Sequence, residues 1–176
     1  LKNLKWVGID STEDALPGRL NVVGLGIVEF DLQLGEKTTE AGRYSMNSLE
    51  KSVDDLASSK VDILVTAPIN KDSIRQAGFK FPGHTEYLAH IANADDVLML
   101  LVADNLRIGV ATGHIAIKDV ASSLTSVAIK KKLELMSESL AVDFGCASPK
   151  IAVLGLNPHA GDNGLMGEEE KTIISP

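Results

Sequence analysis

Short apolar runs alternate with amphipathic segments along most of this chain, and this alternation constrains its fold more than any other feature. The runs are rich in Val, Ile and Leu, as is typical of buried strands, and they occupy residues 20–28, 61–66, 97–102, 108–111 and 151–154. Helices are predicted at residues 38–58, 72–76, 86–92 and 126–142, with a helical turn at 117–120. This order predicts an α/β fold: a layered mixed sheet with flanking helices, forming one partial domain or parts of two.

Single residues mark the expected boundaries of these elements. Thr85 is predicted to cap the helix at 86–92, and Asp104-Asn105 to form a tight turn between two strands. Gly145 is predicted to stop the long helix, whose apolar face comprises Ile129, Leu133, Met136 and Leu140.

Charge and cysteine content exclude several classes of protein. The net charge is −7, and the densest basic run, Lys130–Lys132, is followed by Glu134 and Glu138, so it is interpreted as a solvated helix face and no nucleic-acid partner is expected. Cys146 is the one cysteine, which rules out an internal disulfide and a multi-cysteine zinc site. No apolar run reaches the roughly 18 residues of a membrane span. The predicted location is the cytoplasm, which fits a reducing compartment.

Both ends of the sequence suggest a piece of a longer protein. The chain opens on Leu1-Lys2-Asn3, which is neither a signal peptide nor an initiator methionine. Glu168, Glu169 and Glu170 open a short predicted helix, where acidic residues complement the helix dipole, and the chain stops soon afterwards at Pro176. We therefore expect a truncated chain.

Two of the four histidines follow predicted strands. His114 and His159 are each the first strongly polar side chain after an apolar run, and neutral imidazole is the commonest side-chain ligand for transition metals. The alternative, on spacing alone, is two ordinary loop histidines. His90 lies inside a predicted helix and is interpreted as structural or exposed.

Four further residues are candidates for contacts with a substrate or ligand. His84 and Thr85 stand where a helix opens, and the unpaired N–H groups there attract a carboxylate or phosphate. Lys71 follows a strand and can reach a phosphate as a point charge. Asp162 can orient a ligand or act as a base. The alternatives are a capping turn, a surface lysine and a turn aspartate in Gly161-Asp162-Asn163-Gly164.

The glycines provide no fingerprint for a nucleotide. Gly24-Leu25-Gly26 lacks the third glycine and the following helix of a dinucleotide motif, and the glycine-rich stretch at 155–164 lacks a Walker lysine. A nicotinamide cofactor would therefore bind in a manner other than that of a Rossmann domain.

Four motifs together resemble the 4-hydroxythreonine-4-phosphate dehydrogenase family. They are VTAPINK at 65–71, FPGHTE at 81–86, ATGHIAIKDV at 111–120, and LNPHAGD at 156–162 with Gly164, Gly167, Glu168 and Glu169. They occur in the family's order and roughly its spacing.

The resemblance implies a fold, a reaction and a set of site residues. The fold would be like that of isocitrate and isopropylmalate dehydrogenases, with this chain as the central part of two lobes. The reaction would be the oxidation of 4-phosphooxy-threonine by NAD or NADP, followed by decarboxylation to 3-amino-2-oxopropyl phosphate on the route to pyridoxal phosphate. A homodimer would carry its active site at the interface. By motif, His114 and His159 match two of three ligands to a divalent cation (zinc, magnesium, cobalt or manganese), and His84 and Thr85 match substrate-binding positions.

Departures from the family limit what this chain can do by itself. The family's third metal histidine and its later substrate-binding lysine, asparagine and arginine would lie beyond Pro176, and Asp162 stands where the family often has glutamate. We therefore expect this chain by itself to be inactive. Lys71 and Asp162 are the candidate catalytic residues.

Other functions stay open at this point. A sugar-acid phosphate dehydrogenase of the same family would act on a four-carbon substrate of the threonate or erythronate type. A metal-dependent hydrolase would use His114, His159 and Asp162 without a nucleotide. A non-catalytic domain would keep the fold alone.

Overall fold

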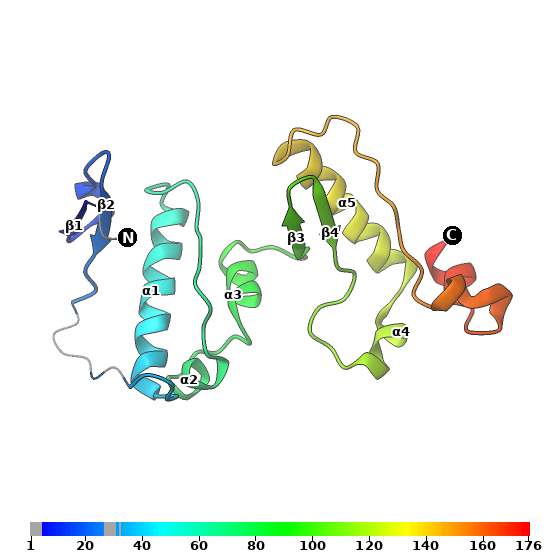
Figure 1. The fold of residues 1–176 in the computed structure, drawn as a ribbon, viewed down its shortest axis with the longest axis horizontal. Helices are drawn as coiled ribbons and strands as arrows, with labels where there is room; N and C mark the ends of the chain where they lie inside the picture. The colour runs from blue at the N-terminus through cyan, green and yellow to red at the C-terminus, as the bar shows by residue number, and fades with distance from the viewer. Residues whose placement is uncertain (1–4, 27–30, 32) are drawn as a thin grey trace. The chain divides into compact units, whose positions relative to one another are not determined.

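The computed structural model describes residues 5–26, 31 and 33–176, and the chain divides into two compact units, Leu1–Asn93 and Ala94–Pro176. The first unit combines a strand pair with the helices α1 to α3. The second combines a β-hairpin with the long helix α5 and several short helical turns (Figure 1).

The strand pair of the first unit is parallel. β1 (Trp6–Ile9) pairs with β2 (Leu20–Val23), so that Trp6 faces Leu20 and Ile9 faces Val23. A 3-10 turn, η1 (Thr12–Asp14), lies between them and is capped by Ser11, whose hydroxyl accepts a hydrogen bond from the Glu13 N–H at 3.3 Å. The strand predicted at 20–28 is β2 in its first part, and its residues 27 and 28 lie outside the described part of the chain.

Three helices build the core of the first unit. They are α1 (Thr39–Ala57), α2 (Lys71–Gln76) and α3 (His84–Ile91). Side-chain caps start the first two: Thr38 accepts from the Ala41 N–H at 3.1 Å, and Asn70 accepts from the Ser73 N–H at 3.0 Å. The buried core residues come from all three helices and the loop after α2: Leu49, Val53, Ile74, Phe79 and Tyr87. This confirms the helices predicted at 38–58 and 72–76.

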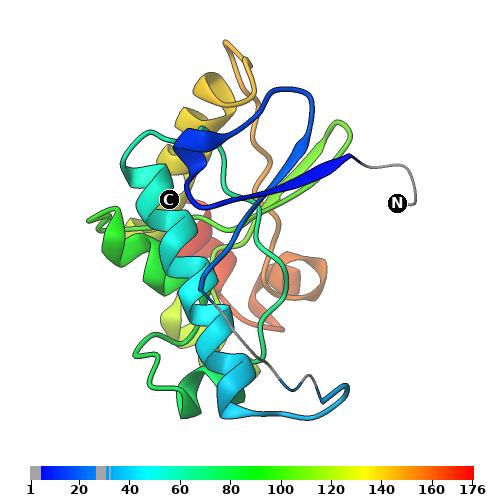
Figure 2. The same cartoon turned by 90° about the vertical axis from the view of Figure 1, so that its left-hand side faces the viewer.

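Gly42 sets how closely α1 and α2 approach. A Cβ atom at this position would overlap the carbonyl group of Ser73, and it would lie 2.9 Å from the Ile74 nitrogen. α2 accordingly lies at the N-terminal end of α1 in both views (Figures 1 and 2). Only glycine permits this backbone contact between α1 and the first turn of α2.

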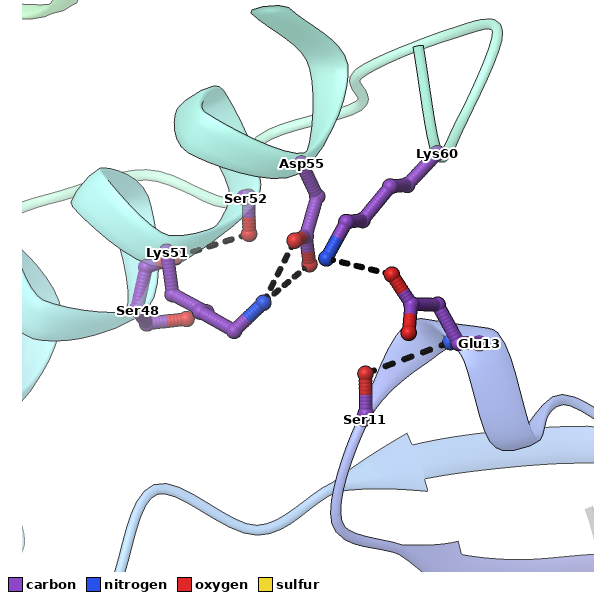
Figure 3. Close-up of polar contacts among 7 residues, drawn as sticks. All are labelled: Ser11, Glu13, Ser48, Lys51, Ser52, Asp55 and Lys60. Carbon is purple, nitrogen blue, oxygen red and sulfur yellow. Dashed lines mark hydrogen bonds and ion pairs between the residues drawn. The ribbon is translucent and has the colours of Figure 1, made fainter. Parts of the chain in front are cut away.

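A chain of alternating charges anchors η1 to the C-terminal end of α1 (Figure 3). Lys51 Nζ lies 2.5 Å from both carboxylate oxygens of Asp55, and Lys60 Nζ lies 2.9 Å from Glu13 Oε1. Asp55 is only 5 % exposed. The hydrogen bond from Lys51 is the largest cause that lowers the pKa of Asp55, and the hydrogen bond from Lys60 is the largest that lowers the pKa of Glu13.

The second unit is organised around a hairpin and a long helix. β3 (Leu100–Ala103) and β4 (Leu106–Gly109) pair antiparallel through a turn at Asp104 and Asn105, as predicted. After β4 come η2 (Ile117–Asp119), α4 (Val120–Ser123) and α5 (Ser126–Val142). The chain ends in η3 (Pro158–Gly164) and a π-helical turn, η4 (Glu170–Ile174).

α5 has the predicted bounds, and the apolar face predicted for it is the face that is buried. Thr125 caps α5 by accepting from the Ala128 N–H at 3.1 Å. Leu140 is buried, and Ile129, Leu133 and Met136 are half-buried along the same face. After the helix, Gly145 adopts φ +67° and the Cys146 N–H bonds to the Leu140 carbonyl at 2.8 Å, so Gly145 acts as the predicted stop.

One lysine of the basic run has a structural role. Lys130 and Lys131 are exposed, as a solvated face requires, but Lys132 bonds to Asp96 and to the carbonyl of Val97. These bonds hold α5 to the segment that precedes β3.

Two predicted strands are absent from the described residues, and two are shifted. The segments 61–66 and 151–154 have no partner in a described ladder, and they expose Ile63 (78 %), Val65 (89 %) and Leu154 (82 %). An apolar run becomes a strand only when a neighbour accepts its backbone hydrogen bonds, and a sequence pattern does not supply that neighbour. The strands expected at 97–102 and 108–111 are β3 and β4, displaced toward the turn.

The start of α3 also differs from prediction. The helix begins at His84 with Gly83 as its N-cap, and the cap makes no side-chain hydrogen bond. Thr85 therefore lies within the first turn of the helix and is not its cap. The α/β class, with parallel and antiparallel pairs both present, is confirmed.

Candidate functional site

The first unit brings Lys71 to the N-terminus of α3. Lys71 is the first residue of α2, and His84 and Thr85 are the first two residues of α3. A Cβ atom at Gly83 would lie 3.6 Å from Lys71 Cε, 3.9 Å from Lys71 Nζ and 3.5 Å from Glu86 Oε2. Three of the predicted site residues, Lys71, His84 and Thr85, thus gather at one place.

This arrangement suits an anion. The first N–H groups of a helix have no intrahelical partner, and the dipole end there is positive. The Lys71 ammonium adds a full positive charge beside them, and its side chain is exposed to solvent. His84 and Thr85 are half-buried and add donors that can be aimed at a phosphate or carboxylate oxygen.

In the second unit, the loops that carry His114 and His159 start at the same cavity. This cavity has a volume of about 320 Å³, and its walls include residues 110–112 and 153–156 together with Leu124, Ile129 and Ile174. Thr112 lies two residues before His114, and Leu156 lies three residues before His159. Both histidines are exposed. The loops that carry His114 and His159 are therefore neighbours where they leave this cavity.

A metal site is not completed by these histidines. The described residues contain no group of three or more His, Cys, Asp or Glu side chains that could hold an ion. Imidazole is the right ligand chemistry for a transition metal, but two imidazoles are fewer than the three protein ligands usual in a catalytic site. His114 and His159 alone do not fit a resident cation.

His159 and Asp162 lie in a turn of unusual hand. The φ angles of His159, Ala160, Gly161, Asp162 and Asn163 are 52°, 51°, 80°, 41° and 58°, all in the left-handed region. This region costs a residue such as Ala160 roughly 1–2 kcal/mol and costs Asp and Asn less, so surrounding contacts must stabilise the turn. The turn in Gly161-Asp162-Asn163-Gly164, which the sequence offered as the alternative to a functional Asp162, is present in the structure. Such strain is concentrated at functional sites in proteins.

Glu170 is the main contact that meets this turn from outside. Its Oε1 accepts a hydrogen bond from the Asn157 N–H at 2.6 Å, and its Oε2 accepts from Asn157 Nδ2 at 3.1 Å. Glu169 Oε2 accepts from the same amide nitrogen at 2.7 Å. The backbone hydrogen bond from Asn157, followed by the one from its side chain, lowers the pKa of Glu170 from its usual value.

Sequence reasoning missed Asn157 and Glu170. The acidic run at 168–170 was interpreted as favourable charge at a helix start, yet Glu170 is buried and faces back to the turn. The only feature of the sequence that could have indicated Glu170 is a carboxylate soon after a glycine-rich loop.

His90 is as interpreted, because it is exposed and its ring lies 5.1 Å from the Phe81 ring. No described helix has both the length and the apolar character to cross a membrane.

Comparison with solved structures assigns the class of protein. The structure of a 4-hydroxythreonine-4-phosphate dehydrogenase from Klebsiella pneumoniae matches with a TM-score of 0.85 and 32 % sequence identity, over 98 % of this chain and 53 % of that one. The fold is therefore that of an α/β dehydrogenase, and the predicted isocitrate/isopropylmalate dehydrogenase-like class is confirmed.

Sequence relatives give the family. A 4-hydroxythreonine-4-phosphate dehydrogenase of Bacteroides thetaiotaomicron is 38 % identical over 96 % of this chain and 46 % of its own length. A D-threonate 4-phosphate dehydrogenase of Cupriavidus necator is 37 % identical over 97 % of this chain and 52 % of its own length. The family model for the pyridoxal phosphate biosynthetic protein PdxA matches residues 2–176. The chain belongs to this family, and it spans about half the length of the curated relatives it matches.

Proposed function

We propose that the natural protein carrying this sequence is a dehydrogenase of pyridoxal phosphate biosynthesis. It would oxidise the secondary alcohol of 4-phosphooxy-threonine, and the resulting β-keto acid would lose carbon dioxide to give 3-amino-2-oxopropyl phosphate. The observation that carries this proposal is the position of Lys71 beside the N-terminus of α3, where the chain offers an anion site. The relatives named for this substrate support it.

The residues of the first unit have a binding role in this proposal. The Lys71 ammonium and the free N–H groups of α3 bind the phosphate of the substrate, and His84 and Thr85 orient it. This leaves the alcohol carbon at a fixed distance from the bound anion, and fixed orientation is a large part of catalysis. Lys71 is a candidate catalytic residue in this proposal because its ammonium contacts the phosphate of the substrate.

The residues of the second unit have a chemical role. When the substrate alcohol is oxidised, its carbon loses a hydride and its oxygen loses a proton. Asp162 is the candidate base for that proton, because it is exposed on the left-handed turn. NAD or NADP would supply the hydride acceptor.

A divalent cation (zinc, magnesium, cobalt or manganese) is part of the proposal, with His114 and His159 as two of its ligands. Because the described residues hold no cluster of three, a further ligand is needed, and a homodimer with its active site at the interface would be one source. The proposed location is the cytoplasm.

A second candidate substrate is D-threonate 4-phosphate. The Cupriavidus necator relative is named for it, at an identity close to that of the Bacteroides relative. The two substrates share the phosphate and the neighbouring alcohol and differ in the amine, so the anion site described above serves either.

Turnover by the natural protein tests the proposal. The protein, supplied with each divalent cation in turn, would be mixed with 4-phosphooxy-threonine or D-threonate 4-phosphate and with NAD or NADP. Formation of the reduced nicotinamide would be followed by absorbance. Faster turnover of 4-phosphooxy-threonine supports the dehydrogenase of pyridoxal phosphate biosynthesis, and faster turnover of D-threonate 4-phosphate supports the second candidate substrate. No reduction with either substrate would show that the dehydrogenase assignment is wrong.

A further inference from the structure

Two carboxylates bind Asn157 at the entry of the left-handed turn at 159–163: Glu169 accepts one hydrogen bond and Glu170 accepts two. Within the turn, the Ala160 N–H bonds to the Asn157 carbonyl at 3.1 Å, and the Met166 N–H bonds to the Gly161 carbonyl at 3.1 Å. These bonds are local and close the turn on itself. They do not fix where it points.

Glu170 contacts the turn at its entry and at its middle. At the entry, its two carboxylate oxygens accept from the backbone and the side chain of Asn157. At the middle, a Cβ atom on Gly161 would lie 3.0 Å from Glu170 Oε2, so the carboxylate packs directly against the Gly161 backbone. A Cβ atom on Gly155 would lie 3.3 Å from Glu170 Oε1. The carboxylate is therefore enclosed by the backbone that leads into the turn and by the turn itself.

Glu170 is an unusual residue to bury. It is 8 % exposed, and none of the ion pairs between described residues includes it. Buried carboxylates are ordinarily paired with a cation, since an isolated buried charge is costly. Here the amide groups of Asn157 take the place of that cation. A residue that served only to fill space would not need a charge.

We propose that Glu170 is a positioning residue, which acts through Asn157 to fix the turn that carries His159 and Asp162. This deepens the proposed function, because it concerns the same site and rests on the roles assigned to those two side chains. Without the hydrogen bonds to Glu170 the turn opens more often, which speeds exchange of its amides. His159 and Asp162 are then no longer held in one position for the substrate.

The test compares Glu170→Gln with Glu170→Ala and with Glu168→Gln in the natural protein. Gln keeps the size of the side chain and one acceptor for the Asn157 N–H, but it presents an NH₂ group to the other donor. Ala removes both acceptors. Glu168 is an exposed carboxylate two residues away and is the matched control.

Hydrogen exchange of the amides at 157–167 is the first measurement. We expect exchange on the order of tenfold faster in Glu170→Gln and faster still in Glu170→Ala, with α5 unchanged and Glu168→Gln like the wild type. Exchange that rises equally throughout the second unit would mean a general structural role and would overturn the proposal, and so would unchanged exchange.

Steady-state kinetics is the second measurement. We expect kcat/KM to fall about 10- to 100-fold in Glu170→Gln and further in Glu170→Ala. Wild-type kcat/KM in both variants would also overturn the proposal. If the wild-type protein reduces no nicotinamide, the proposed function fails, and the exchange measurement still decides whether Glu170 holds the turn.

Discussion

Replacing Gly42 by Ala should destabilise the first unit, although glycine-to-alanine changes inside helices are usually favourable. Gly42 lies in the first turn of α1, and alanine is preferred over glycine in a helix interior by about 1 kcal/mol. The added Cβ would, however, overlap the Ser73 carbonyl. A backbone carbonyl cannot rotate away as a side chain can, so α2 must move.

The clash outweighs the helix propensity. Inserting a methyl group into a closely packed contact costs roughly 1–3 kcal/mol, and the upper end applies because the contacted atoms belong to the backbone. Subtracting the propensity gain of about 1 kcal/mol leaves a net loss of about 2 kcal/mol. For a chain of this size that is a fall in Tm of about 4–8 °C.

Thermal unfolding followed by circular dichroism measures this loss. The control is Asn47→Ala, an exposed position in the same helix, which tests propensity alone and should raise Tm slightly. Because α2 starts at Lys71, Gly42→Ala should also weaken substrate binding. A Gly42→Ala protein as stable as Asn47→Ala would refute the close contact between α1 and α2.

Three further predictions concern the turn, the carboxylates and the isolated chain. Gly161→Ala should speed hydrogen exchange at 157–167, because residue 161 has φ +80° and its Cβ would lie 2.6 Å from the Gly167 carbonyl oxygen. Gly113→Ala, with open space around it, should not change this exchange. Equal exchange in the two variants would contradict the close packing of the turn. The pKa values of Glu13, Asp55, Asp96 and Glu170 are lowered on folding, so the unfolded chain binds more protons in acid. Their contribution to the stability of the folded chain is present above the ordinary carboxyl pKa and is lost as the pH falls through the pKa values of the folded state. Tm should therefore drop in acid, and less steeply in Asp55→Asn. A Tm that does not change with pH would contradict the direction of these pKa shifts. The 176-residue chain by itself should reduce no nicotinamide, since its described residues hold no three-ligand cluster; measurable turnover would show this expectation to be wrong.

Local signals in the sequence were enough to predict several elements. α5 was predicted with its bounds, because its apolar face and the stop at Gly145 are both local to the helix. The hairpin turn at Asp104 and Asn105 is local in the same way. The gathering of Lys71, His84 and Thr85 was not predicted from spacing, because it depends on how α2 and α3 pack.

Features that depend on distant partners were not predictable. Residues 61–66 are mostly apolar and rich in β-branched side chains, but strand formation depends on a neighbour that the pattern does not reveal. Glu170 was seen as one of three acidic residues, and only the folded chain shows that it alone is buried against Asn157. The hand of the turn at His159 depends partly on distant contacts, because Gly161, Asp162 and Asn163 tolerate the left-handed region but Ala160 has no preference for it.

One kinetic comparison tests whether Lys71 and the start of α3 bind the phosphate of the substrate. We would measure kcat/KM of the natural protein for 4-phosphooxy-threonine and for its dephosphorylated form, in the wild type, in Lys71→Ala and in the exposed-lysine control Lys80→Ala. We predict that Lys71→Ala loses about 10- to 100-fold on the phosphorylated substrate, and almost nothing on the other, because a charged hydrogen bond contributes about 1.5–3 kcal/mol. Equal losses on both substrates, or no loss on either, would contradict the claim.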